Sequence, residues 1–498
     1  MRALKFPDRS GASSSMRAMT RWVRGQGIST LMLLLCALPA IATDHPKHES
    51  ATSRTTLAGP TDAEITKLVR YRIVRQRRAH GAVLAILRPE GPSIVAFHDP
   101  STFGEPPPDA NSIFEIASLS KIFTALLLAD ATVRGEVRLN DPLSAYVPAG
   151  VRVPQFDESP ITLVDLATHG SGLPLRPNNL AAKAPDAPNK YAGYTLEQLY
   201  SGLADYQLTR APGTAFEYSN LGFALLGQGL ALALHEPYAD LLRERITRPL
   251  GMTDTHLGEN LETAGRHAQG HGFDLRPIGP TDDGALNPAG GLRSTADDLS
   301  KFLALFVDGA GPGELPSAAL LMLTVDRPGD DAMTRMTLGW RRTTAHDETY
   351  YWSNGSGDGS RTFMGFNPAR RVAVVALADA ASTDGFDDIA RRVLDPKQVV
   401  DLKVLPWREA ITLPESAVNH VIGNYQYAPD DRFEVSRGST GLIVTAGKAQ
   451  FLIQPLSRSR YFAPGIDLLI DFKDAASGPA SALVLHQSGK SYIYKRVP

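Results

Sequence analysis

The stretch Phe114-Glu115-Ile116-Ala117-Ser118-Leu119-Ser120-Lys121 decides how the rest of the chain is interpreted. Apolar residues recur after it at helical spacing as far as Gly135, which predicts a helix that begins at Ser118. Ser118 and Lys121 are three residues apart, so the pattern places both side chains on one face of that helix.

This pairing is suited to nucleophilic catalysis. A serine hydroxyl attacks poorly until a base takes its proton. A lysine held among apolar groups can become such a base, because desolvation disfavours its charged form. The helix amino terminus adds unpaired amides that favour a developing oxyanion. The bare S-x-x-K pattern is common, however, and a polar helix start is the ordinary alternative.

Two further motifs follow in order. Tyr218-Ser219-Asn220 lies about a hundred residues on, and Ser353-Asn354-Gly355-Ser356 follows later. The trio resembles the motifs of the penicillin-recognising serine hydrolases, and its tyrosine is similar to the class C β-lactamase and D-Ala-D-Ala peptidase branch. The stretches 166–174 and 288–295 match as well. The resemblance covers about residues 63–395.

The resemblance implies roles for seven residues. Ser118 would be the nucleophile, Lys121 its base or proton relay, and Tyr218 the general acid/base that returns a proton to the leaving group. Four residues would bind substrate. Asn220 would hold the substrate amide, and Gly355 would let its strand approach the substrate backbone closely. The Ser356 amide, with that of Ser118, would form the oxyanion hole, and Ser353 occupies the first position of the third motif.

Ser353 departs from the family pattern, which has Lys or His at this position to hold a substrate carboxylate. A serine hydroxyl donates one hydrogen bond but brings no charge, and charge-assisted bonds are about twice as strong. Arg361 could compensate, although a solvent-exposed surface arginine is the ordinary interpretation. The departure leaves the family assignment intact and the substrate open.

The resemblance implies a β-lactamase/transpeptidase-like α/β (α+β) fold over residues 63–400: an antiparallel sheet flanked by helices, plus a mostly helical subdomain. Strand-like apolar runs occur at His80–Leu87, Ile94–His98 and Val372–Leu377. Residues 412–498 contain short alternating stretches that predict a small all-β sandwich or barrel, similar to the lipocalin-like modules appended to such enzymes.

Residues 1–42 resemble a secretory signal peptide: arginines precede the apolar run Ile28–Ala40, and cleavage is expected after Ala42. An uncleaved anchor is the alternative, but the run is shorter than the roughly 20 residues that a spanning helix needs. Met16 is an alternative start. Residues 43–62 are expected to be a flexible lead-in. The sequence therefore predicts a secreted or periplasmic protein with no stable membrane span after cleavage.

The remaining composition narrows the function further. The one cysteine, Cys36, lies in the leader, so the mature protein is expected to lack disulfides and thiolate ligands. After the leader 45 basic and 52 acidic residues remain, which disfavours nucleic-acid binding. His267, His271 and Asp274 lack a metal-binding pattern and favour a polar loop. No metal or cofactor is expected, and the oligomeric state is left open.

Three functions are compatible with these residues. The first is hydrolysis of D-Ala-D-Ala peptides or related cell-wall fragments through an acyl-enzyme on Ser118, with β-lactams as substrates or suicide acylators. The second is an esterase or D-amino-acid amidase of the same fold, which Ser353 favours. The third is a non-enzymatic penicillin-binding muropeptide sensor, against which the intact Ser118, Lys121 and Tyr218 argue.

Overall fold

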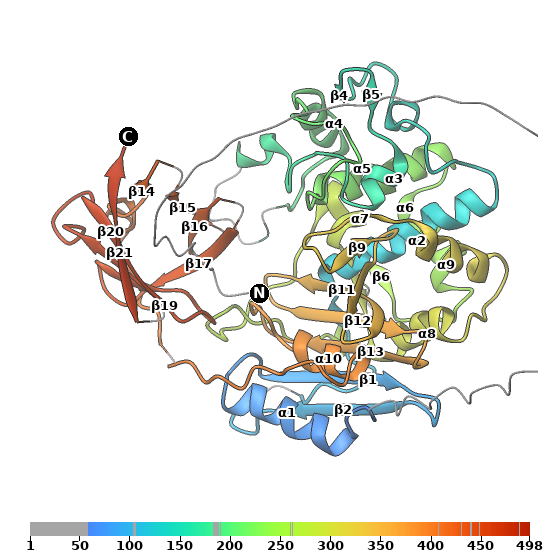
Figure 1. Cartoon of the computed structure of the whole chain (residues 1–498), viewed down its shortest axis with the longest axis horizontal. Helices are drawn as coiled ribbons and strands as arrows, with labels where there is room; N and C mark the ends of the chain where they lie inside the picture. The colour runs from blue at the N-terminus through green and yellow to red at the C-terminus, as the bar shows by residue number, and fades with distance from the viewer. Residues whose placement is uncertain are drawn as a thin grey trace, which may run out of the picture. The chain divides into compact units, whose positions relative to one another are not determined.

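The computed structural model describes residues 58–498 except 103–105, 183–188, 190, 259, 261, 407, 430, 439–440, 448 and 488. Its largest element is an eight-stranded antiparallel sheet in the order β2-β1-β13-β12-β11-β10-β9-β8 (Figure 1). The strands are β1 (Gly81–Leu87), β2 (Ser93–His98), β8 (Arg327–Pro328), β9 (Thr334–Met336), β10 (Arg341–Ala345), β11 (Glu348–Ser356), β12 (Arg361–Asn367) and β13 (Val372–Ala378).

Both faces of this sheet are covered. Alternate residues of β1 enter two separate cores: Leu84 packs in a cluster with α1 (Asp62–Val74) and α10 (Asp387–Leu394), whereas Val83 packs in one with α2 (Ser120–Val133) and α8 (Ala296–Val307). Burial on both sides explains why β1 and β13 read as continuous apolar runs. The pairing of β1 with β13 joins two strands that are far apart in the sequence.

A mostly helical region lies beside the sheet (Figure 1). Its central helix is α2, in which every residue from Ser120 to Ala131 is buried. The other helices are α3 (Leu163–Ala167), α4 (Leu196–Ala204), α5 (Asn220–Ala233), α6 (Tyr238–Leu242), α7 (Asn287–Gly290) and α9 (Leu315–Thr324). Two small sheets complete it, β3-β7-β6 (Phe114–Glu115, Leu292–Ser294, His256–Leu257) and β4-β5 (Gln155–Phe156, Ser159–Pro160).

The carboxy-terminal residues form a closed eight-stranded barrel, preceded by α11 (Glu415–Asn419). The strands are β14 (Gly423–Ala428), β15 (Asp431–Arg437), β16 (Leu442–Ala446), β17 (Ala449–Pro455), β18 (Arg460–Phe462), β19 (Leu468–Lys473), β20 (Ala482–Gln487) and β21 (Lys490–Val497). Pairing of β14 with β21 closes the barrel and leaves no open edge. Of the two predicted forms, a sandwich or a barrel, the structure has the barrel.

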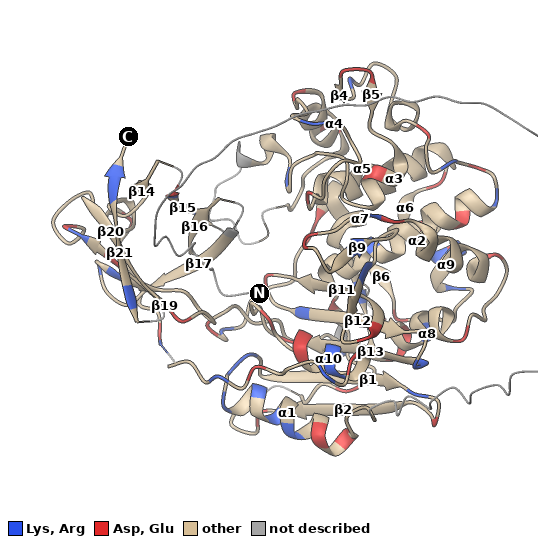
Figure 2. Ribbon diagram, in the orientation of Figure 1, with Lys and Arg blue, Asp and Glu red and all other residues tan. Residues whose placement is uncertain are grey.

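Charged residues of both signs are interspersed along the described chain (Figure 2). In α10 they complement the helix dipole, with Asp387 and Asp388 in the first turn and Arg391 and Arg392 in the last. Within the described residues, no helix is both long and apolar enough to cross a membrane. The predicted leader and most of the lead-in lie outside the described residues.

Candidate active site

Ser118 and Lys121 meet at the start of α2, as their spacing predicts. A single 3₁₀ turn, Ala117–Leu119, leads into the helix at Ser120. This turn leaves Ser118 partly exposed, whereas Lys121 is 3% exposed. The Lys121 Nζ donates to Ser118 Oγ over 2.9 Å and to the carbonyl oxygen of Ala289 over 2.6 Å. The buried ammonium or amine is thus fixed against the serine hydroxyl.

Tyr218 completes this group from the start of α5. The helix is capped by Ser219, whose hydroxyl accepts from the Gly222 amide over 2.8 Å. The Lys121 Nζ lies 5.0 Å from the centroid of the Tyr218 ring. Burial alone would raise the pKa of the Tyr218 phenol, but the Lys121 charge, hydrogen bonding to Lys121 and Ser118, and the Arg341 charge together lower it below its usual value of 10. The phenolate is therefore easier to form than in water.

His169 packs against the Tyr218 ring and contacts the residue that follows it. Its ring stacks on the Tyr218 ring with centroids 4.2 Å apart, and its Nδ1 accepts the Ser219 amide over 3.1 Å. Burial, followed by the charges of Lys121 and Arg341, lowers the pKa of His169 well below 6.5. The imidazole is therefore neutral at pH 7, with Nδ1 unprotonated. His169 lies in the stretch 166–174, but the sequence assigned it no role.

The third motif lies along the end of β11. Because β10 begins at Arg341, opposite Trp352, residues 353–356 of β11 pair with β12 alone among the described strands. A Cβ at Gly355 would lie 2.4 Å from the Ile116 carbonyl oxygen and 3.1 Å from the Ser118 amide nitrogen. Only glycine fits here without displacing neighbours. The unpaired edge of β11 thus runs directly past Ser118.

A cavity of about 80 Å³ adjoins these residues. Ser118, Asn220 and Ser356 line it, together with Tyr191, Asp283 and Asp358. The Asn220 Oδ1 is buried and has no hydrogen-bond partner among the described residues. An unpaired buried acceptor costs free energy until a donor reaches it, so the cavity offers a place for a substrate amide beside Ser118.

Ser353 is 5% exposed and lies two residues from Gly355, hence on the same face of β11. The surface interpretation of Arg361 is wrong. Its side chain is 11% exposed and binds the buried Asp387 over 2.5 Å, and Asp387 also accepts from the Asn354 amide over 2.7 Å. The guanidinium charge of Arg361 is therefore neutralised within the protein.

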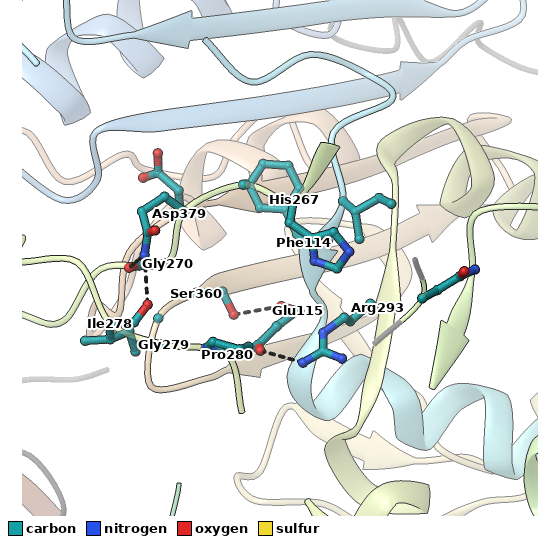
Figure 3. Close-up of a pocket in the computed structure, with 15 residues that line it drawn as sticks. Phe114, Glu115, His267, Gly270, Ile278, Gly279, Pro280, Arg293, Ser360 and Asp379 are labelled. Atoms are coloured by element: carbon teal, nitrogen blue, oxygen red, sulfur yellow. Dashed lines mark hydrogen bonds and ion pairs between the residues drawn. The ribbon is translucent and has the colours of Figure 1, made fainter. Parts of the chain in front are cut away.

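A larger cavity, of about 410 Å³, contains none of the predicted site residues (Figure 3). Its wall includes Glu115, which pairs with Arg293 over 3.2 Å and whose backbone oxygen accepts the Ser360 hydroxyl over 2.7 Å. Thr362 likewise donates to the Ile116 oxygen over 2.9 Å. These bonds fasten the segment before Ser118 to the β11–β12 hairpin. His267 also lines this cavity, and among the described residues no cluster of His, Cys, Asp and Glu is arranged to hold a metal ion.

The chain belongs to the β-lactamase family, because the family model described as Beta-lactamase matches residues 61–396. It is 39% identical over 206 residues to the D-alanyl-D-alanine-carboxypeptidase/endopeptidase AmpH of Escherichia coli K12, which covers 40% of this chain and 50% of that protein. The chain thus spans half the length of that relative. It is 29% identical over 380 residues to the human putative beta-lactamase-like 1, covering 73% and 70% of the two chains.

Solved structures agree with the fold. A β-lactamase/D-alanine carboxypeptidase from Yersinia pestis matches with a TM-score of 0.56 and 26% identity, over 67% of this chain and 96% of that one. An octameric penicillin-binding protein homologue from Pyrococcus abyssi matches with a TM-score of 0.57 and 19% identity, over 87% and 99%. The last likeness concerns the fold alone and extends beyond residues 61–396. The family model and these structures therefore agree on the β-lactamase family and its fold.

Proposed function

We propose that this protein is an exported hydrolase that forms a covalent acyl-enzyme on Ser118 and acts on D-Ala-D-Ala-type peptides and β-lactams. One observation carries the proposal: Lys121 Nζ lies 2.9 Å from Ser118 Oγ and 5.0 Å from the centroid of the Tyr218 ring. A nucleophile within hydrogen-bond reach of its base, itself oriented by a third group, is the arrangement that covalent catalysis needs.

Acylation begins when Ser118 Oγ attacks the carbonyl carbon of the substrate. The serine proton passes to the Tyr218 oxygen, which the adjacent Lys121 charge favours as phenolate. Lys121 remains bound to the Ala289 oxygen and stabilises the negative charge while the proton moves. The amides of Ser118 and Ser356 hold the oxyanion of the tetrahedral intermediate.

The same groups complete the cycle in reverse order. Tyr218 returns the proton to the leaving amine nitrogen as the carbon–nitrogen bond breaks, leaving an ester on Ser118. A water molecule then attacks this ester and gives its proton to Tyr218, and the Ser118 oxygen leaves and recovers a proton. Positioned proton transfer of this kind contributes about 10²–10⁴-fold in rate.

The preference for peptide substrates rests on the open edge of β11. An extended peptide can add to an exposed strand edge through main-chain hydrogen bonds, and Gly355 permits the closest approach at the point where Ser118 lies. Asn220 lines the same cavity as Ser118 and receives the substrate amide there. The relative from Escherichia coli, of whose length the match covers half, is named a carboxypeptidase/endopeptidase, and that name supports the same class of substrate.

An esterase or D-amino-acid amidase is the second candidate, favoured by the neutral Ser353. The two candidates separate on a panel that contains a D-Ala-D-Ala peptide, a D-amino-acid amide, a simple ester and a penicillin. The proposal predicts the highest kcat/KM on the D-peptide or the penicillin. A protein that turns over only the ester or the amide would refute the peptidase assignment while keeping Ser118 as nucleophile.

Export is proposed from the leader-like residues 1–42. Amino-terminal sequencing of the protein from a bacterial periplasm should find a mature chain that begins near Thr43. Recovery of a chain that still contains Cys36 would contradict cleavage.

A further inference from the structure

The backbone just before the nucleophile has an uncommon conformation. Ala117 has a φ of 48°, in the left-handed region that favours glycine. A Cβ is crowded there by the carbonyl oxygen that follows it, so alanine adopts this conformation only where its surroundings enforce it. Ala117 lines the catalytic cavity together with Ser118. The strained residue is therefore part of the site.

This conformation sets the direction of the Ser118 amide. The chain is extended through β3 and turns into the 3₁₀ helix at Ala117. The peptide unit between Ala117 and Ser118 carries the Ser118 N–H, so the backbone angles of Ala117 orient it. That nitrogen lies close to β11, since a Cβ on Gly355 would come within 3.1 Å of it. Relaxation of Ala117 to a negative φ would turn the amide, and the nucleophile with it, away from β11.

Two side-chain hydroxyls hold the two residues that precede Ala117. Ser360 Oγ donates to the Glu115 carbonyl oxygen over 2.7 Å, and Thr362 Oγ1 donates to the Ile116 carbonyl oxygen over 2.9 Å. Ser360 is 3% exposed and Thr362 is 1% exposed. A backbone that moved away would therefore lose hydrogen bonds that water cannot replace.

The same segment is held at further points. Ser120 Oγ donates to the Ala117 carbonyl oxygen over 2.7 Å and accepts the Leu292 amide over 3.0 Å. The Glu115 carboxylate accepts from the amide and the hydroxyl of Thr281 over 2.7 Å and 2.8 Å. One such bond is comparable in free energy with the cost of a left-handed alanine. The bonds together are thus sufficient to maintain the conformation of Ala117.

We propose that Ser360 and Thr362 are positioning residues, whose hydroxyls hold Ala117 in its left-handed conformation and so direct the Ser118 amide towards the oxyanion. The inference rests on the proposed function, in which Ser118 is acylated. A misdirected oxyanion donor weakens binding of the transition state and not of the ground state. Loss of the two hydroxyls should therefore lower the rate of acylation at saturating penicillin and leave the apparent Kd of the penicillin nearly unchanged.

Ala117→Gly separates positioning from stability. Ser360→Ala combined with Thr362→Val removes both hydroxyls and should slow the saturating rate of Ser118 labelling by a fluorescent penicillin about tenfold, which corresponds to about 1.4 kcal/mol. Glycine adopts the left-handed conformation without the steric cost, so adding Ala117→Gly should restore most of this rate. A merely structural role of the two hydroxyls predicts no such rescue.

Ser300→Ala is the matched control. The Ser300 hydroxyl donates to the Ala296 carbonyl oxygen over 2.7 Å within α8, so this variant loses a bond of the same length elsewhere in the protein. Its labelling rate should equal that of the wild type. Thermal melting identifies a temperature at which every variant is folded, and all rates are compared there.

An unchanged labelling rate in the protein without both hydroxyls would overturn their role, and so would a loss that Ala117→Gly does not restore. Should Ser360→Ala with Thr362→Val fail to fold, each single variant is combined with Ala117→Gly, and the same two results decide. Failure of the proposed function looks different, because the wild-type protein itself would then show no labelling of Ser118.

Discussion

Gly355→Ala tests whether β11 really abuts the nucleophile. The new methyl group would lie 2.4 Å from both the Ile116 carbonyl oxygen and the Thr362 Oγ1, whereas ordinary contacts of a Cβ begin near 3.4 Å. Either β11 or the Ile116–Ser118 segment must therefore move by about 1 Å. The Thr362–Ile116 hydrogen bond, now 2.9 Å, lies at the same place and would break.

The expected magnitudes follow from this displacement. Overpacking a well-filled site costs about 1–3 kcal/mol in stability, and a lost hydrogen bond adds about 1 kcal/mol. A misplacement of about 1 Å between nucleophile and oxyanion donors costs about 100-fold in rate. Gly355→Ala should therefore melt a few degrees lower and react with a fluorescent penicillin about 100-fold more slowly.

The assay measures the rate of Ser118 labelling at a temperature where each variant is folded. Gly81→Ala is the matched control, because Gly81 is the first residue of β1 in the same sheet and lies away from Ser118. Its new Cβ would also be crowded, at 2.7 Å from the Pro108 side chain. The control should lose stability but keep its labelling rate. Equal labelling by Gly355→Ala and wild type would refute the placement of β11 beside the nucleophile.

Three other predictions use different parts of the molecule. Tyr218→Phe should lower kcat/KM about 10²–10⁴-fold. In the wild type the activity should rise with pH through the lowered pKa of Tyr218, below 10, because the phenolate is the active form; this rise should vanish in Tyr218→Phe, and its persistence would exclude Tyr218 as the base. His169→Ala removes the stacking partner of Tyr218 and the acceptor of the Ser219 amide, so it should misplace Tyr218 and lower kcat about 10–100-fold. Its circular dichroism spectrum should match that of the wild type, and an unchanged kcat would show that His169 does not position Tyr218. Deletion of residues 412–498 should spare acylation, since every proposed site residue precedes residue 357, and a folded truncated protein that no longer labels would place part of the site in the barrel.

The sequence predicted much of the fold because its patterns are local. The apolar run of β1 and the helix after Ser118 follow from side chains that alternate or recur within a few residues. The alternating stretches within residues 412–498 predicted seven of the barrel strands, at 424–427, 432–436, 442–445, 450–454, 468–472, 482–486 and 491–497. The missed strand, β18, has three residues, Arg460–Phe462, which is too short for alternation to be visible.

The site was predictable only where residues belong to motifs. Ser118 and Lys121 meet because three residues of helix bring them together, and Tyr218 belongs to the second motif. Arg341 could not be found this way, because its position depends on the register that sets it opposite Trp352 across two strands. Its neighbour Arg342 has the same side chain and lies elsewhere, so residue type alone could not distinguish them.

The environments of Arg361 and His169 were also not predictable from the sequence, because both depend on contacts between distant residues. The environment of Arg361 depends on Asp387, 26 residues away at the start of α10, so its burial is invisible in the sequence around it. His169 lies 49 residues before Tyr218, and only the turn that precedes α5 stacks their rings. Long-range contacts of this kind are determined by tertiary packing rather than by local propensity.

The identity of the acylated residue tests the central claim most directly. The purified protein is incubated with a penicillin, quenched, and examined by intact mass spectrometry and peptide mapping. We predict one added penicilloyl mass, located on the peptide that contains Ser118, and no added mass in a folded Ser118→Ala variant. An adduct on another residue, or full turnover by Ser118→Ala, would contradict the assignment of Ser118 as the nucleophile.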